Sequence, residues 1–234
     1  MARSASRAIT VSPLEEESGR LRGGARRRQL IQVAIRLFSQ KGFRGTTTKE
    51  IALAAGITEG IIFRHFPTKD DLYTAILDFK ASESPVEEWL GELRQLAAEG
   101  DDEALFRAVA RRILTHHRKD QDFMRLMLYS ALEGHDLARA FREKQFKPLH
   151  DFLCDYIVAR QRAGAFRHGD ADLAVRAFLA MPIHHGLTTW LLKFKVLNIS
   201  DVEAADKFTQ IFLTGLRHKA RKARRVNGSF QKQG

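Results

Sequence analysis

Cysteine and proline are scarce in this chain, and their scarcity limits the classes of protein it can belong to. The 234 residues include one cysteine, Cys154, and five prolines. One cysteine cannot form an intrachain disulfide, as expected of a protein in a reducing cytosol, so we expect a cytoplasmic location. Paired-cysteine spacings and the His-Glu-x-x-His motif are also missing, so no metal site and no other cofactor is predicted.

A long uninterrupted hydrophobic run is missing as well. The N-terminus has no apolar signal core, and the longest apolar tract, residues 173–192, is interrupted by Arg176 and Pro182. Such a tract is typical of a buried helix rather than a membrane span, so no membrane partner is expected. No Gly-rich phosphate loop occurs, and Cys154 lies in an amphipathic segment, where an inert thiol is the common case. An enzyme is therefore not expected, although a helical enzyme remains an alternative.

Acidic residues are fewer than basic ones, which favours a polyanionic partner. The chain has 39 Lys and Arg against 28 Asp and Glu, a formal net charge of +11. The excess gathers at the two ends, where we expect a flexible basic arm over residues 1–24 and a basic tail over residues 218–234. Such tails add affinity for DNA through counterion release, so a nonspecific DNA-coating protein is one interpretation of this chain.

Helical periodicity fills the chain between its basic ends. Apolar residues recur every three or four positions, and neither an alternating strand pattern nor an internal repeat is seen. Gly42, Gly56 and Pro67 end the first three helices. The chain is therefore predicted to be all-α with about nine helices: an N-terminal three-helix domain at residues 25–70 and a larger helical domain at residues 71–217.

Two prolines fall inside later helical patterns. Pro148 is expected to bend a long helix that includes residues 146–158. Pro182 and Gly186 are expected to interrupt a helix over residues 171–194.

Residues 47–66 have the pattern of two short helices joined by a tight turn. Thr47 and Glu50 have the spacing of a capping box at the start of a helix. Gly56 tolerates the positive φ that the turn requires. Thr58 is expected to cap a further helix that runs to about His65. This arrangement is a helix-turn-helix, although a helical hairpin in an ordinary core has the same outline.

Cationic side chains near the second of these helices favour the DNA-binding interpretation. Arg64 can donate two hydrogen bonds to guanine O6 and N7, or it can clamp a phosphate. Lys69 opens the following helix, where the macrodipole disfavours a cation, and this favours a phosphate contact. Glu59 can accept from cytosine N4, but an acidic residue there more often complements the macrodipole.

Residues 42–52 (GFRGTTTKEIA), 55–58 (AGIT) and 60–72 (GIIFRHFPTKDDL) resemble the TetR family of bacterial transcriptional regulators. The resemblance is dense from Arg28 to Leu77 and beyond that extends only to helix number and length. It implies an all-helical homodimer that binds double-stranded operator DNA, usually as a repressor that a small effector releases.

The resemblance also assigns roles to residues. It implies DNA contacts at Thr47, Thr48, Thr58, Glu59, Gly60, Ile61, Phe63, Arg64, His65 and Lys69. Phe63 departs from the family, which usually has tyrosine there, so the hydroxyl that binds a phosphate is missing and only packing against sugar is left.

The larger domain is expected, by the same resemblance, to bind a small, largely apolar effector and to dimerise. Candidate effector-binding residues are His117, Phe123, Met124, Met127, Phe146, His150, Phe178, Met181 and His185. Candidate dimer-interface residues are Leu187, Trp190, Leu191, Phe208, Phe212 and Leu216. For both sets the alternative is ordinary packing within the chain, which the sequence does not separate from a binding role.

Overall fold

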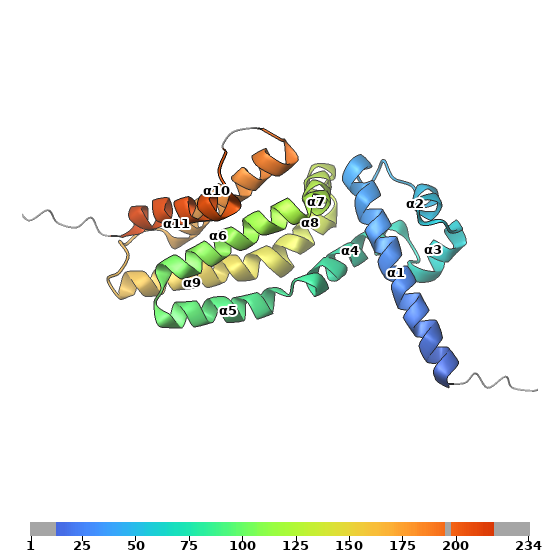
Figure 1. Ribbon diagram of the computed structural model, residues 1–234, viewed down its shortest axis with the longest axis horizontal. Helices are drawn as coiled ribbons and strands as arrows, with labels where there is room; N and C mark the ends of the chain where they lie inside the picture. The colour runs from blue at the N-terminus through green and yellow to red at the C-terminus, as the bar shows by residue number, and fades with distance from the viewer. Residues whose placement is uncertain (1–12, 195–197, 218–234) are drawn as a thin grey trace, which may run out of the picture.

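The computed structural model describes residues 13–194 and 198–217, and these residues form helices joined by short connections (Figure 1). An isolated bridge between Phe166 and Arg217 is the one β-type pairing within them. The predicted all-α class is confirmed. Half of the predicted basic arm, residues 1–12, and all of the predicted basic tail, residues 218–234, lie outside the described residues. None of the helices in the described part is both long and apolar enough to cross a bilayer.

The N-terminal head consists of α1 (Pro13–Lys41), α2 (Thr48–Ala55) and α3 (Glu59–His65), and α4 (Lys69–Glu83) leads away from it. Helix α1 begins earlier than predicted, because residues 13–24, which we expected in a flexible arm, are helical. Proline suits the first position of a helix, and the Leu-Glu-Glu-Glu run after Pro13 consists of good helix formers.

The body consists of seven more helices. They are α5 (Val86–Glu99), α6 (Asp102–Lys119), α7 (Gln121–Glu133), α8 (Asp136–Phe141), α9 (Lys147–Arg162), α10 (Ala171–Gly186) and α11 (Asp201–Leu216). Helices α5 and α8 were not among those predicted. The core of the body centres on Phe106, whose ring centroid lies 5.0 Å from that of Phe178 and 4.9 Å from that of Phe212.

Two π-helical segments interrupt the regular hydrogen bonding of the body. They are η1 (Arg142–Phe146), between α8 and α9, and η2 (Leu187–Leu191), directly after α10. Pro148 lies in the first turn of α9, where no intrahelical donor is required. Pro182 lies within α10 and does not end it, so the predicted interruption falls at Gly186, where η2 takes over.

The hydrophobic core of the head extends onto helices of the body and is separate from the core around Phe106. Head residues such as Leu30, Phe38 and Ile62 form a single buried cluster with Phe123 and Leu126 of α7. Helix α1 packs on α7, and α4 packs on α8. A rearrangement of α4 or α7 therefore acts directly on the packing of the head.

Polar contacts hold the loop between α1 and α2 to the body. The Glu133 carboxylate accepts a hydrogen bond from the Phe43 amide at 2.9 Å. Gly42 has a φ of +73°, and a Cβ at this position would lie 2.4 Å from Glu133 Oε1. His135 Nε2 lies 3.2 Å from Asp70 Oδ1 at the start of α4.

Candidate DNA-binding face and ligand cavity

The start of α2 has the predicted capping box. The Thr47 hydroxyl accepts from the Glu50 amide at 3.2 Å, and the Glu50 carboxylate accepts from the Thr47 amide at 2.9 Å. Lys41, with its ammonium 2.6 Å from Glu50, and Thr47 together lower the pKa of Glu50 to about 2. Gly56 ends α2 with a φ of 67°, as predicted. These local contacts fix where α3 begins.

Helix α3 buries one face and leaves the other in solvent. Ile62 is fully buried against the head core, whereas Phe63 is 46% exposed. Gly60 and Arg64 are exposed too, and Ile61 is partly exposed. Thr58 is the N-cap residue of α3, but its side chain makes no capping bond, contrary to the prediction. Its exposed hydroxyl is therefore not engaged at the start of the helix.

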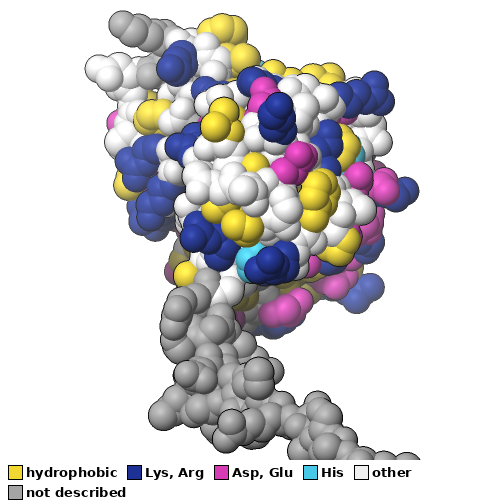
Figure 2. All heavy atoms as spheres, turned by 90° about the vertical axis from the view of Figure 1, so that its right-hand side faces the viewer, with side chains coloured by type: hydrophobic (Ala, Val, Ile, Leu, Met, Phe, Trp, Pro, Cys, Tyr) yellow, Lys and Arg dark blue, Asp and Glu magenta, His cyan; other side chains and the backbone are white. Residues whose placement is uncertain are grey.

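Exposed basic side chains are numerous on the head that carries α3. Figure 2 shows Lys and Arg side chains spread over the end of the molecule that carries α2 and α3. Among residues 23–69, the exposed basic residues are Arg26, Arg27, Arg28, Arg36, Lys41, Arg44, Lys49 and Arg64. An exposed surface of this charge is suited to a polyanion such as a DNA duplex.

Two of the residues predicted to contact DNA are bonded to each other. The Thr48 hydroxyl donates to the carboxylate of Glu59, a half-buried residue in the first turn of α3. This contact links the starts of α2 and α3. It also keeps an acidic group at a helix N-terminus, where the macrodipole stabilises it, in line with the macrodipole interpretation of Glu59.

Lys69 makes contacts within the head that the sequence did not indicate. Its ammonium group donates to the backbone carbonyls of Phe43 at 2.8 Å and Thr46 at 3.0 Å. It also lies 4.0 Å from the centroid of the Phe43 ring. These contacts explain a cation at the start of α4 without DNA, so the argument that its position favours a phosphate contact no longer holds. Thr47 and His65, exposed and half-buried respectively, complete the predicted set on the head.

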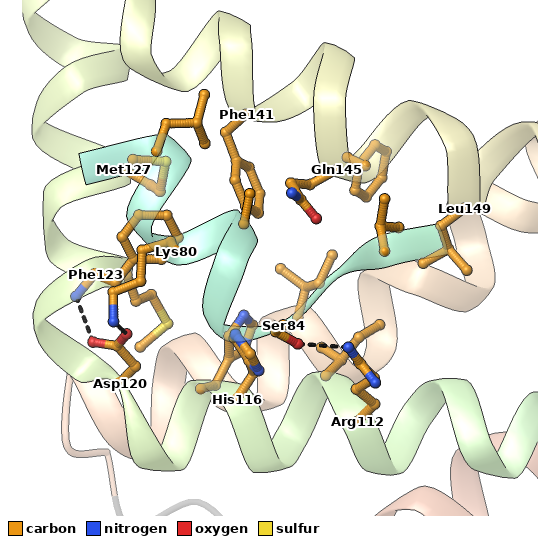
Figure 3. A pocket seen from close by; sticks show the side chains of 18 of the residues that line it. Lys80, Ser84, Arg112, His116, Asp120, Phe123, Met127, Phe141, Gln145 and Leu149 are labelled. Carbon is orange, nitrogen blue, oxygen red and sulfur yellow. Dashed lines mark hydrogen bonds and ion pairs between the residues drawn. The ribbon is translucent and has the colours of Figure 1, made fainter. Parts of the chain in front are cut away.

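A cavity of about 420 Å³ opens between the helices of the body (Figure 3). Helices α4 to α10 and both π-helical segments contribute side chains to it. Its lining residues are Leu77, Lys80, Ala81, Ser84, Val86, Trp89, Arg112, Ile113, His116, His117, Asp120, Phe123, Met124, Met127, Leu128, Ala138, Phe141, Gln145, Phe146, Leu149, Ile183 and Leu187. The volume lies in the range of small-molecule sites, and most of the lining is apolar.

A small number of polar groups face this cavity (Figure 3). Lys80 lies 2.7 Å from Asp120, and although burial opposes its charge, bonds to Asp120 and Glu83 raise its pKa. Arg112 donates to the Ser84 hydroxyl at 2.5 Å. Burial lowers the pKa of Arg112, and Glu92 only partly offsets this effect.

The structure brings together some of the predicted effector residues and separates others. His117, Phe123, Met124, Met127 and Phe146 line the cavity. Burial lowers the pKa of His117 to about 4, so its ring is neutral at pH 7.

The other four predicted effector residues lie elsewhere. Phe178 is buried in the core of the body, which partly buried Met181 packs against. The His185 ring lies 5.6 Å from the ring of Phe208, and His150 Nε2 lies 3.3 Å from Asp172 Oδ1.

Several lining residues carry no signal that sequence reasoning could use. Ser84 and Gln145 are ordinary polar residues in sequence, and Arg112 follows another arginine in the run Arg111-Arg112.

One group of metal-ligand types occurs in the described part of the chain. His150, Cys154 and Asp172 offer ligand atoms within 4.8 Å of one another. Burial and nearby carboxylates, Asp172 foremost, raise the pKa of Cys154 to about 11. The thiol is thus protonated at neutral pH and is a poor metal ligand in this state.

The predicted dimer residues are also divided. Phe212 is only 8% exposed and belongs to the core around Phe106, and Leu187 lines the cavity. Trp190, Leu191, Phe208 and Leu216 are partly buried. The large apolar residues that α10 and α11 leave in solvent are others: Leu173 is 64% exposed, Ile211 63% and Val202 53%.

Comparison with known sequences places the strongest similarity in the head. Residues 30–76 match the sequence profile described as bacterial regulatory proteins, tetR family. Over 94 residues the chain is 33% identical to the HTH-type transcriptional repressor KstR2 of Rhodococcus jostii, a match that covers 40% of this chain and 42% of KstR2. The chain therefore spans less than half the length of this curated relative.

Solved structures match over most of the chain. The structure of AibR in complex with isovaleryl coenzyme A and operator DNA is similar with a TM-score of 0.61 and 23% identity, covering 80% of this chain and 97% of AibR. FadR of Bacillus subtilis in complex with stearoyl-CoA is similar with a TM-score of 0.62 and 16% identity, covering 80% of this chain and 98% of FadR. At this level of identity the similarity concerns the fold.

Proposed function

We propose that the chain, whose head matches the tetR family profile, is a sequence-specific transcriptional regulator of the TetR type, a repressor that a small effector releases from operator DNA. The observation that carries the proposal is the outward face of α3. Gly60, Phe63 and Arg64 are exposed there, while Ile62 fixes the helix to the core. The exposed basic residues of the head supply phosphate contacts, and α3 supplies the side chains that distinguish bases.

The proposed DNA contacts are eight of the ten residues predicted from the sequence, because Lys69 and Glu59 have structural roles within the head. Lys69 positions the loop between α1 and α2, and Glu59 ties α3 to Thr48. Arg64 is the proposed base-reading residue, since its guanidinium fits guanine O6 and N7. We place the protein in the cytoplasm, where it reaches chromosomal DNA.

The active species is proposed to be a homodimer. Two copies of α3 then enter successive major grooves, with half-sites about 34–36 Å or a multiple of it apart. The apolar residues that α10 and α11 expose, such as Leu173 and Ile211, lie on the two helices that we assign to the interface.

The cavity of the body is the proposed effector site. AibR and FadR, whose folds are similar, are complexes with acyl-coenzyme A ligands, and these contain an apolar acyl part. In this chain α4 contributes Lys80, Ala81 and Ser84 to the cavity and begins in the head at Lys69. An effector that moves α4 thus changes the distance between the two copies of α3, and effector and operator weaken each other's binding reciprocally.

Selection from a random duplex library, followed by footprinting, tests the proposal. A near-palindromic protected site is expected for the wild type. Arg64→Ala should lose preference at one base pair in each half-site, a change of roughly 1–3 kcal/mol in discrimination. Uniform protection of every duplex would contradict the proposal and favour a nonspecific DNA-coating protein.

A further inference from the structure

The cavity contains a cation without a carboxylate partner, and this defines a chemical class of effector. We propose that the effector is an apolar carboxylic acid whose carboxylate binds the guanidinium of Arg112 in place of the Ser84 hydroxyl. This inference rests on the proposed effector site and goes beyond it, because it names the residue that selects the ligand and the contact that the ligand breaks.

Arg112 is held by weak partners only. Its guanidinium carbon lies 4.5 Å from the centroid of the Trp89 ring, and it donates to the neutral hydroxyl of Ser84 at 2.5 Å. Among the described residues no carboxylate lies within ion-pair distance of it. A partly buried guanidinium with donors to spare is a strong site for a carboxylate, which it binds through two parallel hydrogen bonds.

The other charges of the cavity are already compensated. The ammonium of Lys80 lies 2.7 Å from the carboxylates of both Asp120 and Glu83. His116 and His117 have lowered pKa values, chiefly because of burial, so both rings are largely neutral at pH 7. Arg112, which Glu92 compensates only in part, is therefore the one charged group among the described lining residues that has no ion-pair partner, and it favours a single anionic group on the ligand.

The rest of the lining fits an apolar body attached to that anion. Figure 3 shows Phe123, Met127 and Phe141 around the part of the cavity away from Arg112. Leu149 lies across the cavity from Phe123, on the same side as Arg112. The two methionines of the lining, Met124 and Met127, adapt to irregular apolar shapes. Gln145, on the π-helical segment η1, offers a neutral carboxamide for one further polar atom of the ligand (Figure 3).

Ser84 links this site to the head. It is the C-cap residue of α4, the helix that begins at Lys69. The bond from Arg112 ties the end of α4 to α6, and no other side-chain hydrogen bond of Ser84 occurs among the described residues. A carboxylate is a better acceptor for a guanidinium than a hydroxyl, so binding of the acid releases Ser84 and frees the C-terminal end of α4.

Calorimetric titration of the purified full chain tests this with ligands of matched length: decanoate, decan-1-ol and decanoyl-coenzyme A. Decanoate should bind at least about tenfold more tightly than decan-1-ol, because the alcohol is uncharged and cannot accept the two parallel hydrogen bonds that a carboxylate accepts from a guanidinium. Arg112→Met should abolish this preference, and Arg112→Lys should retain part of it. Arg111→Met, which changes the neighbouring arginine that lies 3.2 Å from Asp206, is the matched control and should bind like the wild type.

The Ser84→Ala variant tests whether the Ser84 hydroxyl competes with the ligand for Arg112 or only holds Arg112 in position. If Ser84 competes with the ligand, Ser84→Ala should bind decanoate more tightly than the wild type; weaker binding would overturn this part of the proposal. The carboxylate anchor would be refuted if decanoate and decan-1-ol bound equally or if neither bound. It would also be refuted if the preference for decanoate survived Arg112→Met. Tight binding of decanoyl-coenzyme A that is insensitive to Arg112→Met would refute it as well. None of these results bears on the operator footprint, so a failure here is distinct from a failure of the proposed regulator.

Discussion

The presence of glycine at position 60 is not explained by the backbone or packing of the chain itself. Gly60 lies inside α3 without a positive φ, and a Cβ built there meets nothing within 4 Å. Glycine in a helix is less stable than alanine by up to about 1 kcal/mol, so neither the backbone nor the packing requires it. Close approach of another molecule does account for it, and α3 carries the proposed DNA contacts.

Gly60→Ala should therefore stabilise the fold and weaken DNA binding. The free energy of unfolding in urea should rise by up to about 1 kcal/mol, while operator affinity falls. Gly91→Ala is the matched control, because Gly91 is also helical and also has no atom within 4 Å of its Cβ position. It should stabilise the fold without a change in operator affinity. An unchanged affinity for Gly60→Ala would show that DNA does not approach Gly60 closely.

His117 makes stability depend on pH. Its folded pKa is about 4, against 6.5 in the unfolded chain, because burial disfavours the charged ring. Between pH 6.5 and 4 the unfolded ring binds a proton more readily than the folded ring. The contribution of the neutral ring to the free energy of unfolding is therefore complete above pH 6.5 and is lost as the pH falls from 6.5 towards 4. Its total size is on the order of 3 kcal/mol.

His117→Leu should remove this dependence. Nδ1 of His117 is buried and has no hydrogen-bond partner, so an apolar side chain should be tolerated at neutral pH. Urea unfolding at several values between pH 7 and 4.5 should give a shallower decline for the variant than for the wild type. His116 and His185 also have lowered pKa values and stay in both proteins. Parallel declines would mean that His117 is not the titrating group.

At the scale of elements, the helix-turn-helix was predictable because its signals are local. The bounds of α2 follow from the capping box of Thr47 and Glu50 and from the left-handed Gly56, which lie within ten residues. The early start of α1 was missed, since the Arg- and Gly-rich composition of residues 20–28 outweighed the helix formers before it. Lys69 was assigned to phosphate because the macrodipole disfavours a cation at a helix start, but its partners lie 26 and 23 residues earlier in the chain and were not visible in the local sequence.

The cavity was predictable only in part, because its residues come together through tertiary packing. Large apolar residues such as Phe123 and Met127 stand out in sequence, but so does Phe178, which is core. Whether a large apolar residue lines the cavity or belongs to the core depends on which helices pack against each other. The periodicity of the sequence does not contain that information. The π-helical segments that bring Gln145 and Leu187 to the lining also have no sequence signature.

Helix α7 fixes the head through Glu133, and this contact should be measurable. Glu133 accepts from the amides of Phe43 at 2.9 Å and Arg44 at 3.4 Å. Glu133→Ala leaves these donors without a partner and should lower the free energy of unfolding by about 1–2 kcal/mol, with faster hydrogen exchange at the Phe43 amide. Glu133→Gln keeps one acceptor oxygen, so its free energy of unfolding should lie between those of the wild type and Glu133→Ala. Leu132→Ala, at a neighbour that is 85% exposed, should change neither quantity; an equal effect there would exclude a specific role for the carboxylate.

At the scale of the whole molecule, the structure changes which residue should be altered to test the dimer. Phe212 seemed suitable from the sequence, but it packs against Phe106 and Phe178 and is 8% exposed. A charge at this position would disrupt the core of the body, so Phe212→Asp should unfold the protein whether or not it dimerises. Its neighbour Ile211 is 63% exposed and is the better probe.

Ile211→Asp should give folded monomers that bind operator DNA poorly. In a single chain an exposed substitution changes stability by no more than about 0.5 kcal/mol, so circular dichroism and urea unfolding of the isolated chain should stay close to the wild type. In a dimer that buries α11, the same aspartate places an unpaired charge in an apolar contact and should shift the sedimentation coefficient to that of a monomer. A monomer has one α3 and makes only half of the operator contacts. A dimer that persists in Ile211→Asp, with full operator affinity, would place the interface on another face of the body.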